Sequence, residues 1–542
     1  MSGRNRRNNT LPDQDVDAAG GDHAIYPHQI NMPKTSRRQV LAWGAAVSTS
    51  LIACGETMNN VNSADSTGSL LDLSAADAVA AMRTGELTSE AYASALLEQC
   101  QEFSHLNAFI SLEPEKVMAA AWDADVKRAT GAELGPLHGL PIPVKDSINT
   151  IDYPTTGGTP ALRNFRPSQD AKLVRMLKQA GAFVLGKTNI HELSFGWTSN
   201  NTAYGAVHNP YDTDRIPGGS SGGTAAAIAA RMAPLGIAED TQGSIRVPAA
   251  LCGICGFRPT THRYPNAGVM PITPLFDQVG PHARCVEDLQ LFDAIVLGKQ
   301  PDFRPASLQG VRLGVPRQYY FGGLDSDVER ITEISLGKLA DAGAVLVEAD
   351  VPDLENLISL TTAPAQLLDV ERQFSKYLET YGGGITFGDV LAQASDDIKG
   401  VFADYVLPGG QYTMSQEAFD AARDVHIPAL RETMRAYFRD RNVVAMIFPT
   451  TMMPAPPIGQ DIMVEIGGTP ITLEIAMARN ISPGSTSGIP GLVLPAGLSP
   501  GGLPVSIELD GPENSDEALL ALGRVIEAVL GRLPPPTTLS GN

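Results

Sequence analysis

Short apolar runs alternate with longer amphipathic segments along most of the chain. Bounded apolar runs are typical of buried strands, and they occur at residues 141–144, 182–185, 234–238, 311–315, 344–348, 443–448, 492–495 and 505–509. Hydrophobic positions at helical spacing predict helices over residues 74–83, 89–103, 114–130, 171–181, 224–232, 286–297 and 328–342. Strands that alternate with helices favour an α/β fold layered around a mostly buried sheet.

The pattern changes at two other places along the chain. Residues 55–70 are rich in Asn, Ser, Thr and Gly, which is typical of a tether. Residues 353–440 are more helical and less regularly patterned, so we interpret them as a helical insertion or cap that shapes a pocket. The globular domain is therefore predicted to span residues 71–535.

The first 54 residues resemble an export signal. Arg37 and Arg38 form a twin-arginine pattern, and the apolar run 41–53 that follows is too short and too interrupted to span a membrane. The run ends Leu-Ile-Ala before Cys54, which resembles a bacterial lipobox. We predict a Tat-exported lipoprotein, lipidated at Cys54, that a lipid anchor holds to a membrane facing the periplasm. The alternative is an ordinary polar N-terminus on a cytoplasmic protein.

Composition narrows the classes of partner. Of the 542 residues, 43% are hydrophobic and 18% charged, which is typical of a globular protein with a large core. The formal net charge is −20, which argues against a nucleic-acid partner because phosphate backbones are bound by Lys and Arg. The sequence has no H-E-x-x-H motif and no paired His/Cys cluster beyond one lone C-x-x-C, so no metal or other cofactor is predicted.

Four cysteines follow Cys54. Cys252 and Cys255 form a lone C-x-x-C without a second ligand pair or a thioredoxin-like context. We predict that these two, Cys100 and Cys285 are buried free thiols.

Two glycine-rich turns carry the candidate chemistry. The first reads Gly-Gly-Ser-Ser-Gly-Gly at residues 218–223, and the second is Gln242-Gly243-Ser244. Glycine permits unusual backbone conformations and lets main-chain N–H groups approach a ligand closely. A serine nucleophile beside an oxyanion hole needs both properties. Because neither turn contains His, a lysine base is an accepted alternative.

The run over residues 218–260, GGSSGGTAAAIAARMAPLGIAEDTQGSIRVPAALCGICGFRPT, resembles the signature of the amidase signature family of serine hydrolases. Two upstream blocks are similar to other parts of that family: GPLHGLPIPVKD at 135–146 resembles its lysine motif, and 187–212 resembles the segment before its serine loop. The resemblance extends over about residues 73–533. It implies a mixed central β-sheet covered by helices on both faces.

Carried over residue by residue, the resemblance implies that Ser244 is the nucleophile, Ser220 a bridging serine in a cis peptide, and Lys145 the base. The lysine must be neutral to act, so burial must lower its pKa from about 10.4. The preceding apolar run, 140–144, favours that burial. The oxyanion hole would be formed by the backbone N–H groups of Thr241, Gln242, Gly243 and Ser244. Three further residues would brace the loops: Ser221, Asp240 and Arg246.

One residue departs from the family pattern. Gln242 stands where the family usually has glycine, and a positive φ there would strain Gln by about 1 kcal/mol or more. We interpret Gln242 as a residue that lines the substrate pocket, with Phe195, Trp197 and Tyr204 as further candidates. These three aromatic residues are equally typical of a core.

The resemblance implies a serine amidase that hydrolyses the C–N bond of a small or medium carboxamide to a carboxylic acid and ammonia or an amine, through an acyl-enzyme on Ser244. The blocks at 192–204 and 257–269 look closest to aryl- and mandelamide-type members. Esterase or aryl-acylamidase activity is an alternative.

Three other classes of protein are less favoured. A non-catalytic ligand-binding lipoprotein on the same scaffold would not need Lys145, Ser220 and Ser244 intact. An α/β-hydrolase elbow should follow a buried strand, but the polar segment 208–212 precedes the first glycine turn. The export signal and the net charge of −20 argue against a tRNA-dependent amidotransferase subunit.

Overall fold

The computed structural model describes residues 70–301 and 307–536. The predicted signal region, its lipidation site Cys54, and the tether up to residue 69 lie outside the described residues. No helix of the described part is both long and apolar enough to cross a bilayer.

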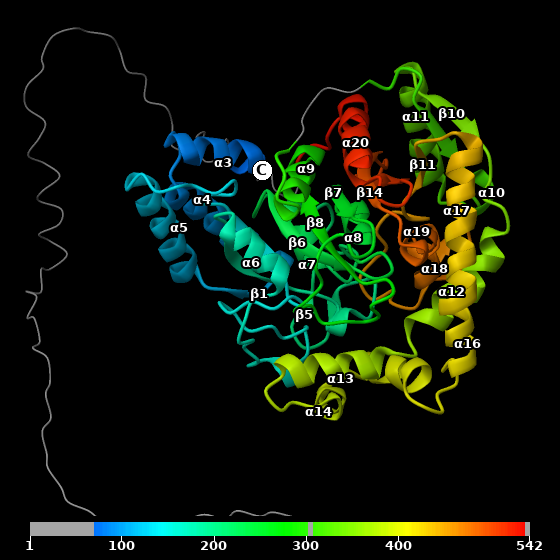
Figure 1. The fold of residues 1–542 in the computed structure, drawn as a ribbon, viewed down its shortest axis with the longest axis horizontal. Coiled ribbons are helices and arrows are strands. Elements are labelled where there is room, and N and C mark those ends of the chain that lie inside the picture. The colour runs from blue at the N-terminus through cyan, green and yellow to red at the C-terminus, as the bar shows by residue number, and fades with distance from the viewer. Residues whose placement is uncertain (1–69, 302–306, 537–542) are drawn as a thin grey trace, which may run out of the picture. The chain divides into compact units, whose positions relative to one another are not determined.

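An 11-stranded sheet forms the centre of the described domain (Figure 1). Its strands lie in the order β1 (Phe109–Leu112), β3 (Phe183–Thr188), β2 (Pro141–Lys145), β6 (Leu235–Asp240), β8 (Gln278–Ala283), β7 (Cys255–Arg258), β14 (Gly491–Leu498), β15 (Pro504–Asp510), β11 (Ala445–Pro449), β9 (Arg312–Val315) and β10 (Val345–Glu348).

The sheet is mixed. Strand β2 pairs in parallel with β3 and β6, and β9 pairs in parallel with β10 and β11. The strands from β6 through β8, β7, β14 and β15 to β11 pair antiparallel. The α/β fold with a mixed central sheet, implied by the family resemblance, is confirmed.

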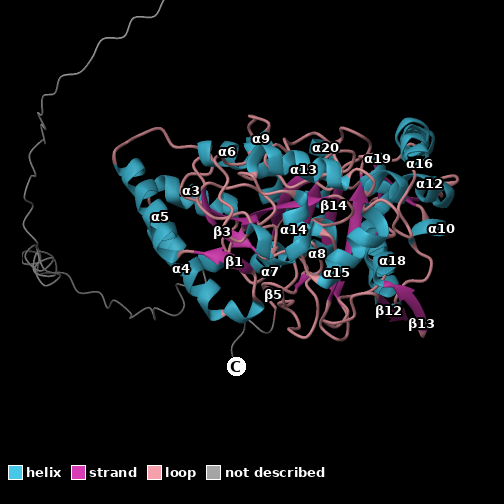
Figure 2. Cartoon of the chain, turned by 90° about the horizontal axis from the view of Figure 1, so that it is seen from below, coloured by secondary structure: helices cyan, strands magenta, loops and turns pink. Residues whose placement is uncertain are grey.

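Helices cover both faces of the sheet (Figure 2). One face packs against α9 (Val286–Val296), α11 (Ser326–Asp341) and α20 (Asp516–Leu530), and the other against α7 (Gly222–Ala229) and α8 (Arg246–Leu251). Helix α20 buries Leu519, Leu520 and Ile526 on a single stripe, as an amphipathic surface helix does. Every residue of the alanine-rich α7 is buried, so this helix fits closely against the strands that carry the site.

The first helices of the domain follow their sequence signals. They are α3 (Ala75–Thr84), α4 (Ser89–Glu102), α5 (Pro114–Ala129) and α6 (Lys172–Gln179). Ser74 caps α3 by accepting the N–H of Asp77, and Thr88 caps α4 in the same way. Pro114 occupies the first turn of α5, where its missing N–H costs nothing.

The segment predicted as a helical insertion or cap is helical, and Figure 1 shows much of it in yellow. Its elements are α12 (Leu354–Gln366), α13 (Val370–Tyr381), α14 (Phe387–Gln393), α15 (Asp396–Val401), the π turn η4 (Phe402–Val406), α16 (Gln416–Ala421), the π turn η5 (Ala422–His426) and α17 (Ile427–Arg441). Phe387 packs against both Phe374 and Phe402, in an apolar cluster that also includes Leu162 and Ile272 from outside this segment. The domain boundaries themselves stay predictions.

All eight strands and all seven helices expected from the apolar pattern are present. Strands β1, β7 and β8 were not predicted. In β7 and β8 the apolar pattern is interrupted by polar side chains, Arg258 and His282, which are nevertheless buried. The 15-residue helix α20 was also missed, as was α8. So were shorter elements: β4 (Asn200–Asn201), β5 (Gly205–Ala206), β12 (Met463–Ile466), β13 (Thr469–Thr472), α10 (Arg317–Tyr320), α18 (Leu473–Ala478), α19 (Ser482–Ser487), η1 (Ser104–Leu106), η2 (Pro160–Leu162) and η3 (Glu192–Ser194).

Candidate active site

Lys145, Ser220 and Ser244 meet at one end of the sheet. Lys145 is the last residue of β2, Ser220 precedes α7, and Ser244 lies between β6 and α8. Because β2 and β6 are parallel neighbours, their carboxyl ends lie side by side. Lys145 Nζ donates to Ser220 Oγ over 2.6 Å, and Ser220 Oγ donates to Ser244 Oγ over 2.9 Å. The three side chains form one unbroken chain of hydrogen bonds.

The loop that carries Ser220 is tightly held. The peptide bond between Gly219 and Ser220 is cis, as the family resemblance implies. A Cβ on Gly219 would lie 2.8 Å from the backbone of Trp197, so this position has room only for glycine. Ser199 Oγ donates to the carbonyl oxygen of Gly218 over 2.9 Å, which anchors the loop before the serine.

Two opposing influences act on the pKa of Lys145. The side chain is buried, and the carboxylate of Glu239 lies 2.6 Å from Nζ. Burial lowers the pKa of Lys145, whereas the negative charge of Glu239 raises it. The pKa remains below that of a free lysine, which is the direction that a general base requires.

Glu239 was missed in the sequence analysis. Its Oε1 accepts hydrogen bonds from Ser194 Oγ over 2.6 Å and from Ser147 Oγ over 3.4 Å. Its backbone carbonyl accepts a third from Ser221 Oγ over 3.2 Å. Its position in the sequence could have revealed it, because an acidic residue inside a fully buried strand needs a partner of opposite charge.

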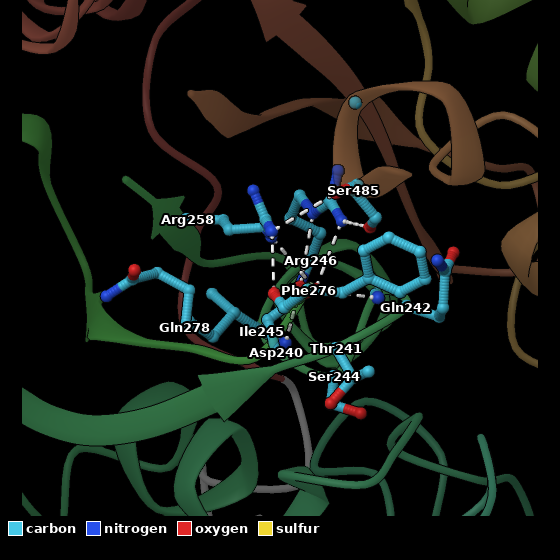
Figure 3. Close-up of polar contacts among 12 residues, drawn as sticks. Asp240, Thr241, Gln242, Ser244, Ile245, Arg246, Arg258, Phe276, Gln278 and Ser485 are labelled. Carbon is cyan, nitrogen blue, oxygen red and sulfur yellow. Dashed lines mark hydrogen bonds and ion pairs between the residues drawn. The ribbon is translucent and has the colours of Figure 1, made fainter. Parts of the chain in front are cut away.

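Asp240 organises the serine loop, which we define as residues 241–245. Arg246 Nη2 lies 3.1 Å from Asp240 Oδ1, and Arg258 Nε lies 3.5 Å from the same oxygen (Figure 3). Asp240 Oδ1 also accepts the N–H of Gly243 over 2.8 Å. Burial raises the pKa of Asp240, but the two guanidinium groups outweigh it and hold this pKa at about 2. The ionised carboxylate therefore ties the loop to two buried arginines.

The expected oxyanion hole needs one correction. Gly243, with φ of 104°, directs its N–H to the Asp240 carboxylate, so this N–H is not available to a substrate. The N–H groups of Gln242 and Ser244 have no protein acceptor in the described part of the chain. Thr241, Gln242 and Ser244 all line the adjacent cavity.

This cavity has a volume of about 340 Å³ and opens beside Ser244. Phe195, Trp197 and Gln242 form part of its wall, and Tyr405 of η4 contributes from the helical segment. The remaining lining residues are Ser194, Gly196, Thr241, Ile272, Thr362, Ala363, Gln366, Leu367, Val401, Asp461, Ile462, Thr472 and Glu474.

Tyr204 is not among the residues that line this cavity. Tyr204 lies in the turn between β4 and β5, and its backbone carbonyl oxygen accepts a hydrogen bond from Asn107 Nδ2 over 2.8 Å. Its ring lies 5.7 Å from the guanidinium of Arg163. Asn107 is remote in the sequence, so the residues around Tyr204 do not indicate this contact.

Gln242 is accommodated without backbone strain, because its φ is not positive. Its side chain extends away from Ser244 (Figure 3), and Nε2 donates to Thr486 Oγ1 over 3.3 Å. Thr486 Oγ1 lies 2.9 Å from Thr362 Oγ1 of α12. The Gln242 Oε1 atom is buried and has no partner within the described residues.

The four cysteines beyond Cys54 are buried and free, as predicted. Burial raises the pKa of Cys100 to about 12, and it also raises the pKa of Cys252. Both thiols are therefore protonated near neutral pH and inert as nucleophiles.

The comparisons with known proteins decide the family. The family model described as Amidase matches residues 91–520, which is more than half of the chain. The chain belongs to the amidase family. It is an amide hydrolase that acts on carbon–nitrogen bonds other than peptide bonds.

Individual relatives agree with this assignment. An indoleacetamide hydrolase of Agrobacterium vitis is 39% identical over 82% of this chain and 94% of its own length. A mandelamide hydrolase of Pseudomonas putida is 37% identical over 86% of this chain and 93% of its own. A solved amidase structure, 29% identical, superposes with a TM-score of 0.75 over 85% of this chain and all of its own.

Proposed function

We propose that this amidase hydrolyses small aromatic carboxamides through an acyl-enzyme on Ser244. The hydrogen-bonded chain from Ser244 through Ser220 to Lys145 is the observation that carries the proposal. A serine hydroxyl becomes a competent nucleophile only when a base takes its proton, and a buried lysine of lowered pKa provides that base.

In the proposed acylation step, Ser244 Oγ attacks the amide carbon. Its proton passes to Ser220 Oγ while the Ser220 proton passes to Lys145 Nζ. The tetrahedral intermediate collapses when the C–N bond breaks, and the proton returns along the same path to the leaving nitrogen. Water then attacks the acyl-enzyme, with the same relay acting as base, and releases the carboxylic acid.

The negative oxygen of the intermediate needs donors fixed in advance. We assign this role to the backbone N–H groups of Thr241, Gln242 and Ser244. Gly243 braces the loop instead, because its N–H is held by Asp240. Ser221, Asp240 and Arg246 hold the two serine loops in place without touching the substrate.

The cavity supports an aromatic acyl group. Phe195, Trp197 and Tyr405 provide aromatic surface, and Ile272, Leu367, Val401 and Ile462 add apolar wall. The names of two relatives specify indoleacetamide and mandelamide, which are aromatic primary amides.

The test compares hydrolysis of indoleacetamide, mandelamide and acetamide by the native chain and by two variants. We expect higher kcat/KM for the two aromatic amides, and a loss of kcat by about 10³-fold or more in Ser244→Ala. Ser94→Ala, on the remote helix α4, is the matched control and should retain full activity. Equal turnover of all three amides would overturn the substrate class, and an active Ser244→Ala would overturn the mechanism.

We further propose that the chain is a Tat-exported lipoprotein anchored through Cys54 and facing the periplasm. The support is the twin arginine at 37–38, the apolar run at 41–53 and the lipobox-like ending, in the required order. Substituting Cys54 by Ala should release the protein from the membrane fraction, and replacing both arginines by lysine should block export. Membrane association that survives Cys54→Ala would contradict the anchor.

A further inference from the structure

One carboxylate oxygen collects three side-chain donors next to the base. Glu239 Oε1 lies 2.6 Å from Lys145 Nζ, 2.6 Å from Ser194 Oγ and 3.4 Å from Ser147 Oγ. The Glu239 residue is only 4% exposed, and the lysine side chain is fully buried. A carboxylate placed in this way contacts the base, and Glu239 is not among the residues that line the cavity.

The charges around Lys145 single out Glu239. Only Glu239, among the ionisable side chains near the lysine, makes a direct contact with Nζ in the described residues. The other groups that act on the lysine or feel its charge lie farther away: Asp240 on β6, Asp277 before β8, His282 on β8 and His191 before η3. Lys187 of the adjacent β3 is already paired with Asp146, at 3.0 Å.

We propose that Glu239 is a positioning residue that stabilises the Lys145 ammonium formed when Ser244 loses its proton. The inference rests on the proposed function, in which Lys145 is the base. During acylation one proton leaves Ser244 Oγ, one crosses from Ser220 Oγ to Lys145 Nζ, and the new ammonium faces the Glu239 carboxylate. No proton has to reach Glu239, and the charge of the pair stays balanced until the leaving nitrogen takes the proton back.

In this arrangement Glu239 acts on the base as the aspartate of a Ser-His-Asp triad acts on its histidine. In Ser-His-Asp enzymes the aspartate orients the histidine and stabilises its charged form. Here Glu239 does the same for a lysine, which would otherwise be a buried and uncompensated cation after proton transfer. Ser194, which lines the cavity, connects the same carboxylate to the substrate-binding wall.

The charge of Glu239 has a measurable consequence for the pH profile. Lys145 must be neutral in the free enzyme, so kcat/KM falls as the pH drops through its pKa. The carboxylate favours the ammonium and therefore raises that pKa. In Glu239→Gln, which keeps the shape and loses the charge, we expect the acidic limb of kcat/KM to move to lower pH by about one unit or more. We also expect kcat on the plateau to fall about tenfold or more, because the ammonium is less stable.

Glu192→Gln is the matched control. Glu192 is also buried, but its Oε2 accepts the backbone N–H of Ser395 over 3.1 Å and its side chain does not contact Lys145. This variant should leave the acidic limb in place even if it lowers stability. A purely structural role for Glu239 would likewise lower stability without moving the limb.

Glu239→Asp keeps the proposal testable if Glu239→Gln does not fold. The shorter carboxylate withdraws from Lys145, so the acidic limb should shift in the same direction by a smaller amount. An unchanged limb in the folded Glu239 variants would overturn the proposal. If the native chain itself fails to form a covalent adduct at Ser244 with a fluorophosphonate, the proposed function fails first, and the two failures are thereby distinguished.

Discussion

At the scale of single residues, the site depends on ionisable groups that the fold has removed from water. Lys145 is the clearest case, because burial and the Glu239 carboxylate shift its pKa in opposite directions. Asp277 is a second case. Its Oδ1 accepts a hydrogen bond from Thr241 Oγ1 over 2.7 Å, and burial raises its pKa to about 7. The serine loop is therefore in contact with a group that titrates near neutral pH.

Asp277 predicts a pH dependence of stability. Its unfolded pKa is about 3.9, so between about pH 4 and pH 7 the folded state keeps a proton that the unfolded state has released. The free energy of unfolding must then fall as the pH rises through that window. Asp277→Asn has no carboxyl at this position and therefore lacks this pH-dependent contribution to the free energy of unfolding. Urea denaturation at several pH values should show the native chain losing stability relative to the variant from pH 4 to pH 8. Parallel pH profiles would contradict the assignment.

Sequence reasoning named Lys145, Ser220 and Ser244 because each lies within a short and specific motif. It did not find Glu239, whose contact with Lys145 depends on the pairing of β2 with β6 rather than on local sequence. It also named Tyr204, which is not among the residues that line the cavity and lies in a turn held by a residue far away in the chain. Motifs identify the reacting groups, whereas tertiary pairing decides what surrounds them.

At the scale of elements, the apolar pattern predicted the strands buried by aliphatic residues and missed β7 and β8. Those two strands bury Arg258 and His282, whose polar character is satisfied only by partners elsewhere in the fold. Helix α7 illustrates the opposite case. Its alanines gave a helical pattern over residues 224–232, and the small size of its alanines and glycines is what allows α7 to lie against β2 and β6 beside Ser220.

The close fit of α7 can be tested at Gly223. A Cβ there would lie 2.4 Å from the carbonyl oxygen of Asn189 and 2.5 Å from that of Ala108, and neither backbone atom can yield easily. Gly223→Ala should therefore markedly lower the melting temperature and the activity. Gly337→Ala in α11 is the control, because nothing lies within 4 Å of its Cβ, and it should add about 0.5–1 kcal/mol of stability. Equal effects of the two substitutions would contradict this packing.

At the scale of the whole domain, Arg246 joins segments that are far apart in the chain. Besides Asp240, it contacts Glu508 of β15 at 2.8 Å, and its guanidinium also donates to Ser485 of α19. The buried arginine thus links the serine loop to the C-terminal half of the sheet. No local pattern could have predicted these partners, which lie more than 200 positions away in the sequence.

Removing the arginine should destabilise the fold rather than only the site. Arg246→Ala would leave Asp240 and Glu508 buried without their shared partner, and breaking a buried ion pair in this way costs about 3–5 kcal/mol. Arg435→Ala, which removes only exposed ion pairs, should change little. Guanidinium denaturation of both variants would measure the difference, and similar midpoints would contradict the bridging role.

The most direct test of the central claim is the intact mass of the full chain after treatment with a fluorophosphonate, measured beside Ser244→Ala and Lys145→Ala. The account predicts one adduct on the native chain, none on Ser244→Ala, and slow labelling of Lys145→Ala, because the serine then lacks its base. An adduct that persists on Ser244→Ala, or a folded native chain that takes no adduct, would contradict it.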